Sequence, residues 1–195
     1  MARPIEFDYD DVIERATHQF WMDGFVASSV QKLLDATRIN RGTMYNSFGE
    51  KEAFFKSCVE HYNSVLKKLM DATLGNQLHK APAALTEFFQ DIVTGVPAAR
   101  RGYGCLLVNS QCESIQWDEN MAKLIRESFT TIRKALLQRT RELEKSRALA
   151  SGISAEFAAD QLVALYQSAK LGLRAGKSPK QTLEHIHFSL EAILK

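Results

Sequence analysis

Hydrophobic residues recur along this chain at spacings of three and four, and the strict alternation that strands show is scarce. Such spacing places apolar side chains on one face of a helix. Val12, Ile13, Ala16 and Phe20 form the first of these stripes, which ends near Gly24. Continued to the C-terminus, the pattern predicts about nine helices, no sheet and no internal repeat. We therefore expect an all-α fold.

Residues that favour helix ends stand between these stripes. Ser28 or Ser29 can cap a second helix, and Asn40 can cap a third. A longer apolar stripe then begins at Lys51, and five further helices are expected after it. The last of them opens with Ser178-Pro179, a cap followed by a first-turn proline.

Composition sets limits on the class of protein. The 195 residues are 45% hydrophobic and 25% charged, with a net charge of +2, as in an ordinary globular domain. The first sixty residues hold seven lysines and arginines against ten acidic residues, so any nucleic-acid surface there must be local. Three unpaired cysteines, no apolar signal region and no long apolar run indicate a cytoplasmic protein without a membrane span.

Residues 28–52, SSVQKLLDATRINRGTMYNSFGEKE, carry the most information. They read as two short helices joined by a tight turn. The outer face of the second helix carries small polar side chains, whereas Met44 and Phe48 belong to its inner face. A protein that lays a helix into the DNA major groove needs this arrangement, and an enzyme site does not.

Each outward position of the second helix has a plausible contact with DNA. Asn40 lies at the N-terminus, where unpaired backbone N–H groups can also meet a phosphate. Arg41 can reach a guanine edge or a phosphate, and Asn46 can make a bidentate contact with adenine. Thr43 can contact a phosphate or a thymine methyl group, and Tyr45 can lie along the sugar–phosphate wall.

Residues 37–52, TRINRGTMYNSFGEKE, resemble the signature of the tetracycline-repressor (TetR) family of transcriptional regulators. Gly42, Thr43, Tyr45, Phe48 and Lys51 stand where the family pattern expects them, and Lys51 matches a phosphate contact. The expected DNA-binding residues are Ser28, Asn40, Arg41, Gly42, Thr43, Tyr45, Asn46 and Lys51. Arg38 replaces the usual turn glycine, which costs about 1 kcal/mol if that position needs a positive φ.

The resemblance also implies an organisation for the chain. Residues 1–55 would form the helix-turn-helix DNA-binding domain, and residues 56–195 the effector-binding and dimerisation domain. The expected partners are a palindromic double-stranded operator, a small-molecule effector and a second copy of the chain. The expected activity is repression, with release from the operator by a small molecule or by an electrophile or oxidant. No cofactor and no metal site are expected.

The last two helices would form the homodimer interface. Of its residues, all but Gln161 are apolar or small, and Ala169 and Gly172 would allow close helix packing: Gln161, Leu162, Leu165, Ala169, Gly172, Leu173, Ile186, Leu190 and Ile193. The effector pocket would lie among the middle helices. Its expected residues are mostly aromatic, although plain core packing is an open alternative for each: Phe88, Phe89, Cys105, Asn109, Trp117, Phe129 and Tyr166.

Cys105 stands in the segment RRGYGCLLVN, residues 100–109. The segment resembles the start of the sixth helix in a branch of the family that includes electrophile- and oxidant-responsive repressors. A helix N-terminus and the nearby Arg100 and Arg101 would favour a thiolate. The alternative is a buried cysteine that only packs, which is also our expectation for Cys58 and Cys112.

Two other classes of protein were weighed against a DNA-binding regulator. No glycine-rich phosphate loop, nucleophile elbow or metal triad occurs in the sequence, so an enzyme is not expected. A helical interaction or scaffold protein without sequence-specific DNA binding remains an alternative, but it would not need the polar face of NRGTMYNSF.

Overall fold

The structure is a computed structural model that describes residues 7–113, 117 and 119–195. These residues form nine α-helices and one short 3₁₀ helix, and they contain no strand beyond an isolated bridge between Leu149 and Leu194. The expected all-α fold is confirmed. The bounds are α1 (Tyr9–Ala27), α2 (Val30–Thr37), α3 (Arg41–Phe48), α4 (Lys51–Ala72), α5 (Ala81–Thr94), η1 (Ala98–Tyr103), α6 (Leu106–Glu113), α7 (Glu119–Lys145), α8 (Ala155–Arg174) and α9 (Pro179–Ile193).

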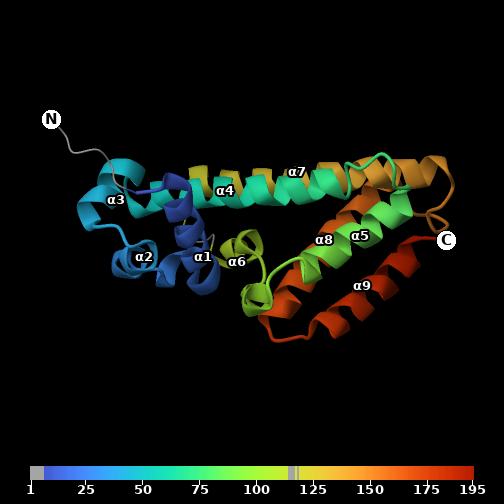
Figure 1. The fold of residues 1–195 in the computed structure, drawn as a ribbon. Helices are drawn as coiled ribbons and strands as arrows, with labels where there is room; N and C mark the ends of the chain where they lie inside the picture. Colours follow the sequence, from blue (N-terminus) through green and yellow to red (C-terminus); the bar gives the residue numbers. More distant parts are fainter. Residues whose placement is uncertain (1–6, 114–116, 118) are drawn as a thin grey trace.

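Helices α1 to α3 lie together at one end of the molecule (Figure 1). Phe20, Leu33, Met44 and Phe48 are all buried there, so the three short helices share one core. Helix α1 breaks at Gly24, whose φ of 82° lies outside the range that other residues readily adopt. The predicted boundary at this glycine is therefore a kink, and helical backbone resumes for one more turn.

Helix α4 runs without a break from the helix-turn-helix end into the rest of the molecule (Figure 1). Its buried face includes Phe54, Phe55, Val59 and Leu66. Val65 lies outside this face and is 54% exposed. A rod of 22 residues thus joins the two parts directly, with no flexible linker between them.

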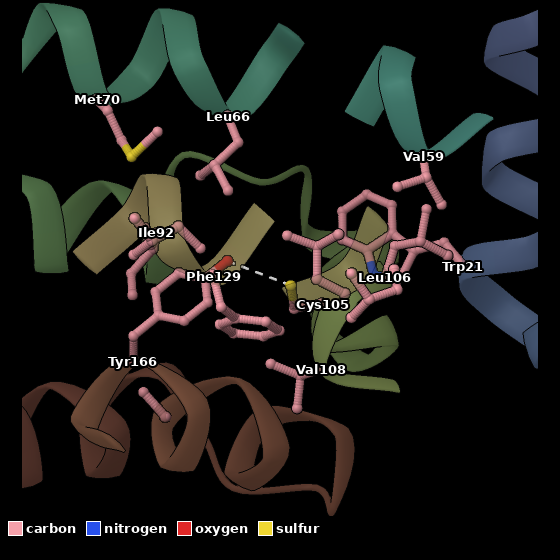
Figure 2. Packing of buried hydrophobic residues seen from close by; sticks show 14 of the residues in the cluster. Trp21, Val59, Leu66, Met70, Ile92, Cys105, Leu106, Val108, Phe129 and Tyr166 are labelled. Carbon is pink, nitrogen blue, oxygen red and sulfur yellow. Dashed lines mark hydrogen bonds between the residues drawn. The ribbon is translucent and has the colours of Figure 1, made fainter. Parts of the chain in front are cut away.

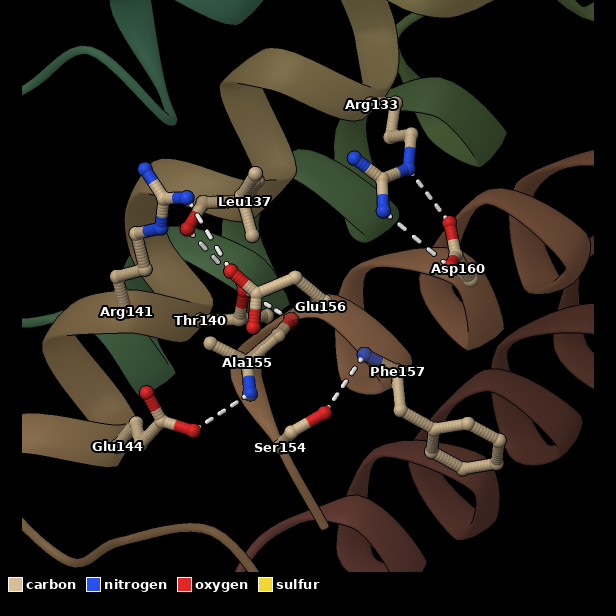
Figure 3. Close-up of polar contacts among 10 residues, drawn as sticks. All are labelled: Arg133, Leu137, Thr140, Arg141, Glu144, Ser154, Ala155, Glu156, Phe157 and Asp160. Carbon is tan, nitrogen blue, oxygen red and sulfur yellow. Dashed lines mark hydrogen bonds and ion pairs between the residues drawn. The ribbon is translucent and has the colours of Figure 1, made fainter.

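The C-terminal part packs α5, α7, α8 and α9 together, and its loops are held by specific polar contacts. Glu144 accepts the N–H of Ala155 at 2.8 Å, and Ser154 caps α8 by accepting the N–H of Phe157 at 3.2 Å (Figure 3). Arg133 holds Asp160 through two hydrogen bonds of 2.6 and 3.2 Å. These contacts fix the turn between α7 and α8.

Candidate nucleic-acid interface and body cavity

Helix α3 presents a polar surface and buries an apolar one. Arg41, Gly42 and Asn46 are exposed, whereas Met44 and Phe48 are 0% and 6% exposed. Thr43 and Tyr45 lie between the two faces and are half-buried. Asn40 caps the helix, with its Oδ1 accepting the N–H of Thr43 at 2.8 Å. The expected division of this helix into a core face and an outward polar face is confirmed.

The turn that leads into α3 is built on a strained residue. Arg38 ends α2 in the left-handed region, with φ 59° and ψ 26°, and its N–H donates to the carbonyl of Leu34 at 2.8 Å. Thr37 and Ile39 on either side are buried. The turn therefore keeps the glycine-type conformation even though an arginine occupies it.

Ser28 does not belong to the outward surface, and its expected DNA contact is corrected here. Its side chain is fully buried, and its hydroxyl donates to the carbonyl of Gly24 at 2.6 Å. It satisfies a backbone group that the kink in α1 leaves open. Ser29 is the cap of α2, because its hydroxyl accepts the N–H of Lys32 at 3.2 Å.

Lys51 packs against the kink of α1. Its Nζ lies 4.4 Å from the centroid of the Phe25 ring, and burial lowers the pKa of its amine. The N–H of Phe25 donates to the carboxylate of Glu113 at 2.8 Å, so α6 reaches the same place. The role of Lys51 as a phosphate contact stays a prediction, and the cation–π contact is a second role that the sequence did not indicate.

A cavity of about 550 Å³ lies between α1, α4, α5, η1 and α8. Its apolar walls include Val65, Leu66, Leu69 and Ile92. Charged and titratable side chains also line it: Glu14, His18, His61, Asp91, Arg100 and Lys170. Because α1 contributes to the wall, an occupant would touch the helix-turn-helix unit as well as the body.

Burial and neighbouring charges shift the pKa values of three titratable side chains in the cavity. Arg100 lies 2.5 Å from Nε2 of His18, and burial together with this guanidinium lowers the pKa of His18. Burial raises the pKa of the Asp91 carboxyl, and Glu87 adds to the effect. Lys170 is 4% exposed, and desolvation lowers the pKa of its amine.

Of the seven predicted pocket residues, Tyr166 lines this cavity and the other six pack elsewhere. Phe88 and Phe89 are fully buried, and Trp117 packs edge-on against the Phe55 ring at 5.5 Å. The side-chain amide of Asn109 donates to the carbonyl of Tyr103 at 2.9 Å, and Phe129 lies at a separate, shallower hollow. These aromatic side chains are core, which the sequence analysis kept as the alternative.

Cys105 is also core, but it has polar neighbours. Its sulfur is 3.4 Å from the hydroxyl of Tyr62. It also lies 3.2 Å from the hydroxyl of Tyr166 (Figure 2). Burial raises the pKa of both phenols, and the thiol beside them adds to the effect. The side chain of Arg100 contacts His18, and that of Arg101 donates to the carbonyl of Val96 at 3.0 Å. Both arginine side chains therefore have partners other than Cys105.

The other two cysteines differ from each other. Cys58 is buried as expected, and burial raises the pKa of its thiol to about 12. Cys112 is exposed, so its expected core position is corrected.

The predicted dimer residues are covered by the chain itself. Eight of the nine are buried within a single copy: Leu162, Leu165, Ala169, Gly172, Leu173, Ile186, Leu190 and Ile193. They pack into the body, and this corrects their expected contact with a partner. The outward side of α8 instead carries a stripe at spacings of four and three: Phe157, Gln161, Ala164, Ser168 and Leu171. Phe188 on α9 is 73% exposed.

Sequence analysis also missed Lys170, Trp21 and His18 as cavity residues. A signal was present for Lys170, which stands four residues after Tyr166 inside the buried stripe of α8, where a lysine is unusual. For Trp21 and His18 the sequence held no signal, because these side chains line the cavity only after α1 docks onto α4.

Among the described residues, no helix is long and apolar enough to cross a membrane, and no group of three or more metal-binding side chains occurs.

Comparison with known proteins gives three informative matches, and no family model matches the chain. The transcriptional repressor DhaR of Mycobacterium sp. (strain GP1) is 23% identical over 183 residues, which is 94% of this chain and 90% of DhaR. The repressor ComR of Escherichia coli K12 is 27% identical over 117 residues, 60% of this chain and 55% of ComR. The chain thus spans little more than half of ComR.

Among solved structures, a cysteine mutant of the TetR-family regulator CifR in complex with operator DNA superposes with a TM-score of 0.85. It is 21% identical, and the superposition covers 98% of this chain and 100% of CifR. The likeness therefore concerns the whole fold.

Proposed function

We propose, from a chain with the fold of the TetR-family transcriptional regulators, that this protein binds operator DNA and regulates transcription. The observation that carries the proposal is the surface of α3. Arg41, Gly42 and Asn46 project from a helix whose opposite side, Met44 and Phe48, is locked into the core. A rigid helix with a polar outer face is what major-groove recognition needs. Residues 1–55 are the proposed DNA-binding domain.

The homodimer is part of this proposal. Two recognition helices must lie about 34–36 Å apart to reach successive major grooves. The outward stripe of α8, where Phe157 and Leu171 are each about half exposed, and the exposed Phe188 of α9 are the surfaces that we propose a second copy covers. The small residues Ala164 and Ser168 in the stripe allow helices to approach closely.

Residues 56–195 are the proposed effector-binding and dimerisation domain. The cavity is the proposed effector site because it is lined by α1, which belongs to the helix-turn-helix end, and by α4, which runs from that end into the body. An occupant that shifts α4 would change the spacing of the two recognition helices. Coupling of this kind is typically about 1–3 kcal/mol and acts in both directions, so operator DNA must weaken effector binding by the same factor.

Release by an electrophile or oxidant at Cys105 is a second route to the same movement. The thiol contacts Tyr62 and Tyr166, which both line the cavity, so a bulky adduct would push on the cavity wall. Cys105→Ser should bind operator normally and fail to release it on treatment with a quinone or hypochlorite. Cys58→Ser and Cys112→Ser should still respond. If Cys105→Ser releases operator DNA as readily as wild type does, covalent sensing at Cys105 is rejected and the effector is a reversible ligand.

The experiment that tests the main proposal is titration of the chain's own upstream DNA by fluorescence anisotropy over a salt series. A regulator should bind it more tightly than random DNA of the same length, with affinity falling steeply as salt rises. A scaffold protein or an enzyme would bind neither DNA specifically.

A further inference from the structure

A buried lysine lines the cavity. Lys170 is 4% exposed and lies one helical turn after Tyr166, which is fully buried. Its Nζ donates to the backbone carbonyl of Ile92 at 2.6 Å, across the gap between α8 and α5. A surface lysine of a helix would extend into water, so this amine is held inside by the packing of α8.

The amine has no acidic partner in the described part of the chain. An ammonium group has three N–H donors, and the carbonyl of Ile92 accepts from one. Of the two acids that line the cavity, Glu14 faces His18 and Arg100 at 3.8 and 3.9 Å. The other, Asp91, has a pKa raised by burial and by Glu87, and Lys170 is not among the groups that shift it. Burial without a counter-ion disfavours the charged form of this amine, and the amine lines an empty volume that can admit a counter-ion.

The rest of the cavity suits an apolar molecule. Leu66 and Ile92 approach Tyr166 from two other helices (Figure 2), and Val65 and Leu69 extend the same wall. A volume of about 550 Å³ lies in the range of small-molecule sites, which combine apolar walls with a few placed polar groups. His18 and Arg100 add donors on the α1 side.

We propose that this cavity binds an organic anion, a molecule with an apolar or aromatic body and one carboxylate, whose carboxylate pairs with Nζ of Lys170. A carboxylate supplies the counter-ion that the chain lacks, and the apolar body covers Val65, Leu66 and Ile92. A neutral molecule leaves the amine unpaired, and a cation is repelled by it. This proposal names the chemical class of the effector. Binding of the anion does not depend on the proposed function, but an effect of the anion on DNA binding does.

The test compares three probes of nearly the same shape by calorimetry on the full chain: 1-naphthylacetate, 1-naphthylacetamide and 1-naphthylethylammonium. Wild type should bind the carboxylate at least tenfold more tightly than the amide and should not bind the ammonium. The proposal is overturned if wild type binds the carboxylate and the amide with equal affinity, or binds neither at millimolar concentration. This outcome needs no variant.

Variants then locate the site. Lys170→Met should lower the affinity for the carboxylate at least tenfold and change that for the amide less than threefold, whereas Lys170→Arg should keep the preference. Val65→Trp, at a half-exposed wall position, should block both probes. The control is Lys180→Met, because that lysine is exposed on α9 and should leave both affinities unchanged. Carboxylate binding that survives in Val65→Trp, or a preference that survives in Lys170→Met, would place the anion elsewhere.

DNA titration of the same samples separates the two proposals. Specific operator binding without anion binding would reject the ligand class and keep the regulator. Anion binding without any specific DNA binding would keep the ligand site and reject the regulator.

Discussion

Helix α3 at the helix-turn-helix end has one face in the core and one face in solvent, whereas the main apolar face of α8 in the body is buried by the same chain. In α3 the buried residues, Met44 and Phe48, and the outward ones, Arg41 and Asn46, lie as the sequence predicts. In α8 and α9 the helices are as predicted, but the residues assigned to the dimer interface are buried inside one copy.

The difference follows from the number of neighbours that each helix has. A short helix such as α3, which docks on α4, has one buried face and one free face, so apolar spacing identifies both. Helix α8 is packed against α7, α9 and η1, so its main apolar stripe is buried by other helices of the same chain. The surface left for a partner is then a weaker second stripe of mixed residues, such as Gln161 and Ser168.

The largest effect is expected from an arginine placed on the buried side of α9, compared with one placed on its exposed side. Leu190→Arg should destabilise the fold by on the order of 4 kcal/mol or more, because Leu190 is 4% exposed and the charge would have no partner. Thermal unfolding followed by circular dichroism measures this loss.

The matched control is Phe188→Arg, two residues away. Phe188 is 73% exposed, so this variant should keep its helical content and dissociate to a monomer in light scattering. A folded Leu190→Arg monomer together with a dimeric Phe188→Arg would restore the interface that the sequence predicts.

A second prediction tests which residues contact bases and which contact phosphates. Asn46→Ala should cost about 1–3 kcal/mol at one base pair of the half-site and little on random DNA, since a base contact carries sequence information. Lys51→Ala should weaken binding to all DNA alike and reduce the salt slope by about one unit, as expected of a phosphate contact. Anisotropy with specific and random DNA distinguishes the two patterns. Equal losses on both DNAs for Asn46→Ala would remove its role in reading bases.

A third prediction concerns the turn. Arg38 holds a φ of 59°, which costs an L-residue with a side chain about 1 kcal/mol relative to glycine. Arg38→Gly should therefore raise the free energy of unfolding by up to that amount, measured by urea denaturation. Arg38→Ala is the control, because it removes the charge and keeps the strain. A gain from Arg38→Ala as large as that from Arg38→Gly would indicate a charge effect instead of backbone strain.

The smallest expected effect is a pH dependence at the contact between α1 and η1. Burial and Arg100 lower the folded-state pKa of His18 below its ordinary value of 6.5. The neutral form is thus favoured in the fold, so its stabilisation is complete above pH 6.5 and is lost as pH falls through the lowered pKa. His18→Gln should flatten the fall of Tm between pH 7.5 and 5 relative to wild type. A variant that loses Tm on acidification as steeply as wild type would assign the effect to other groups.

The sequence by itself determined the helices, their caps and the two faces of α3. These features depend on residues three and four apart, on Asn40 beside the helix it caps and on Gly24 at the kink of α1, all of which are local. The resemblance to TetR-family regulators also rests on one contiguous segment, which is why it could be read without a structure.

The tertiary structure decided which surfaces remain free and which side chains meet at the cavity. Lys170 and the carbonyl of Ile92 are 78 residues apart, and Cys105 meets Tyr62 and Tyr166 from 43 and 61 residues away. Apolar spacing predicts that a residue will be buried, but it does not predict which other residues it will pack against. Burial of Ser28, exposure of Cys112 and the loss of the predicted dimer stripe to the core all follow from how the helices dock.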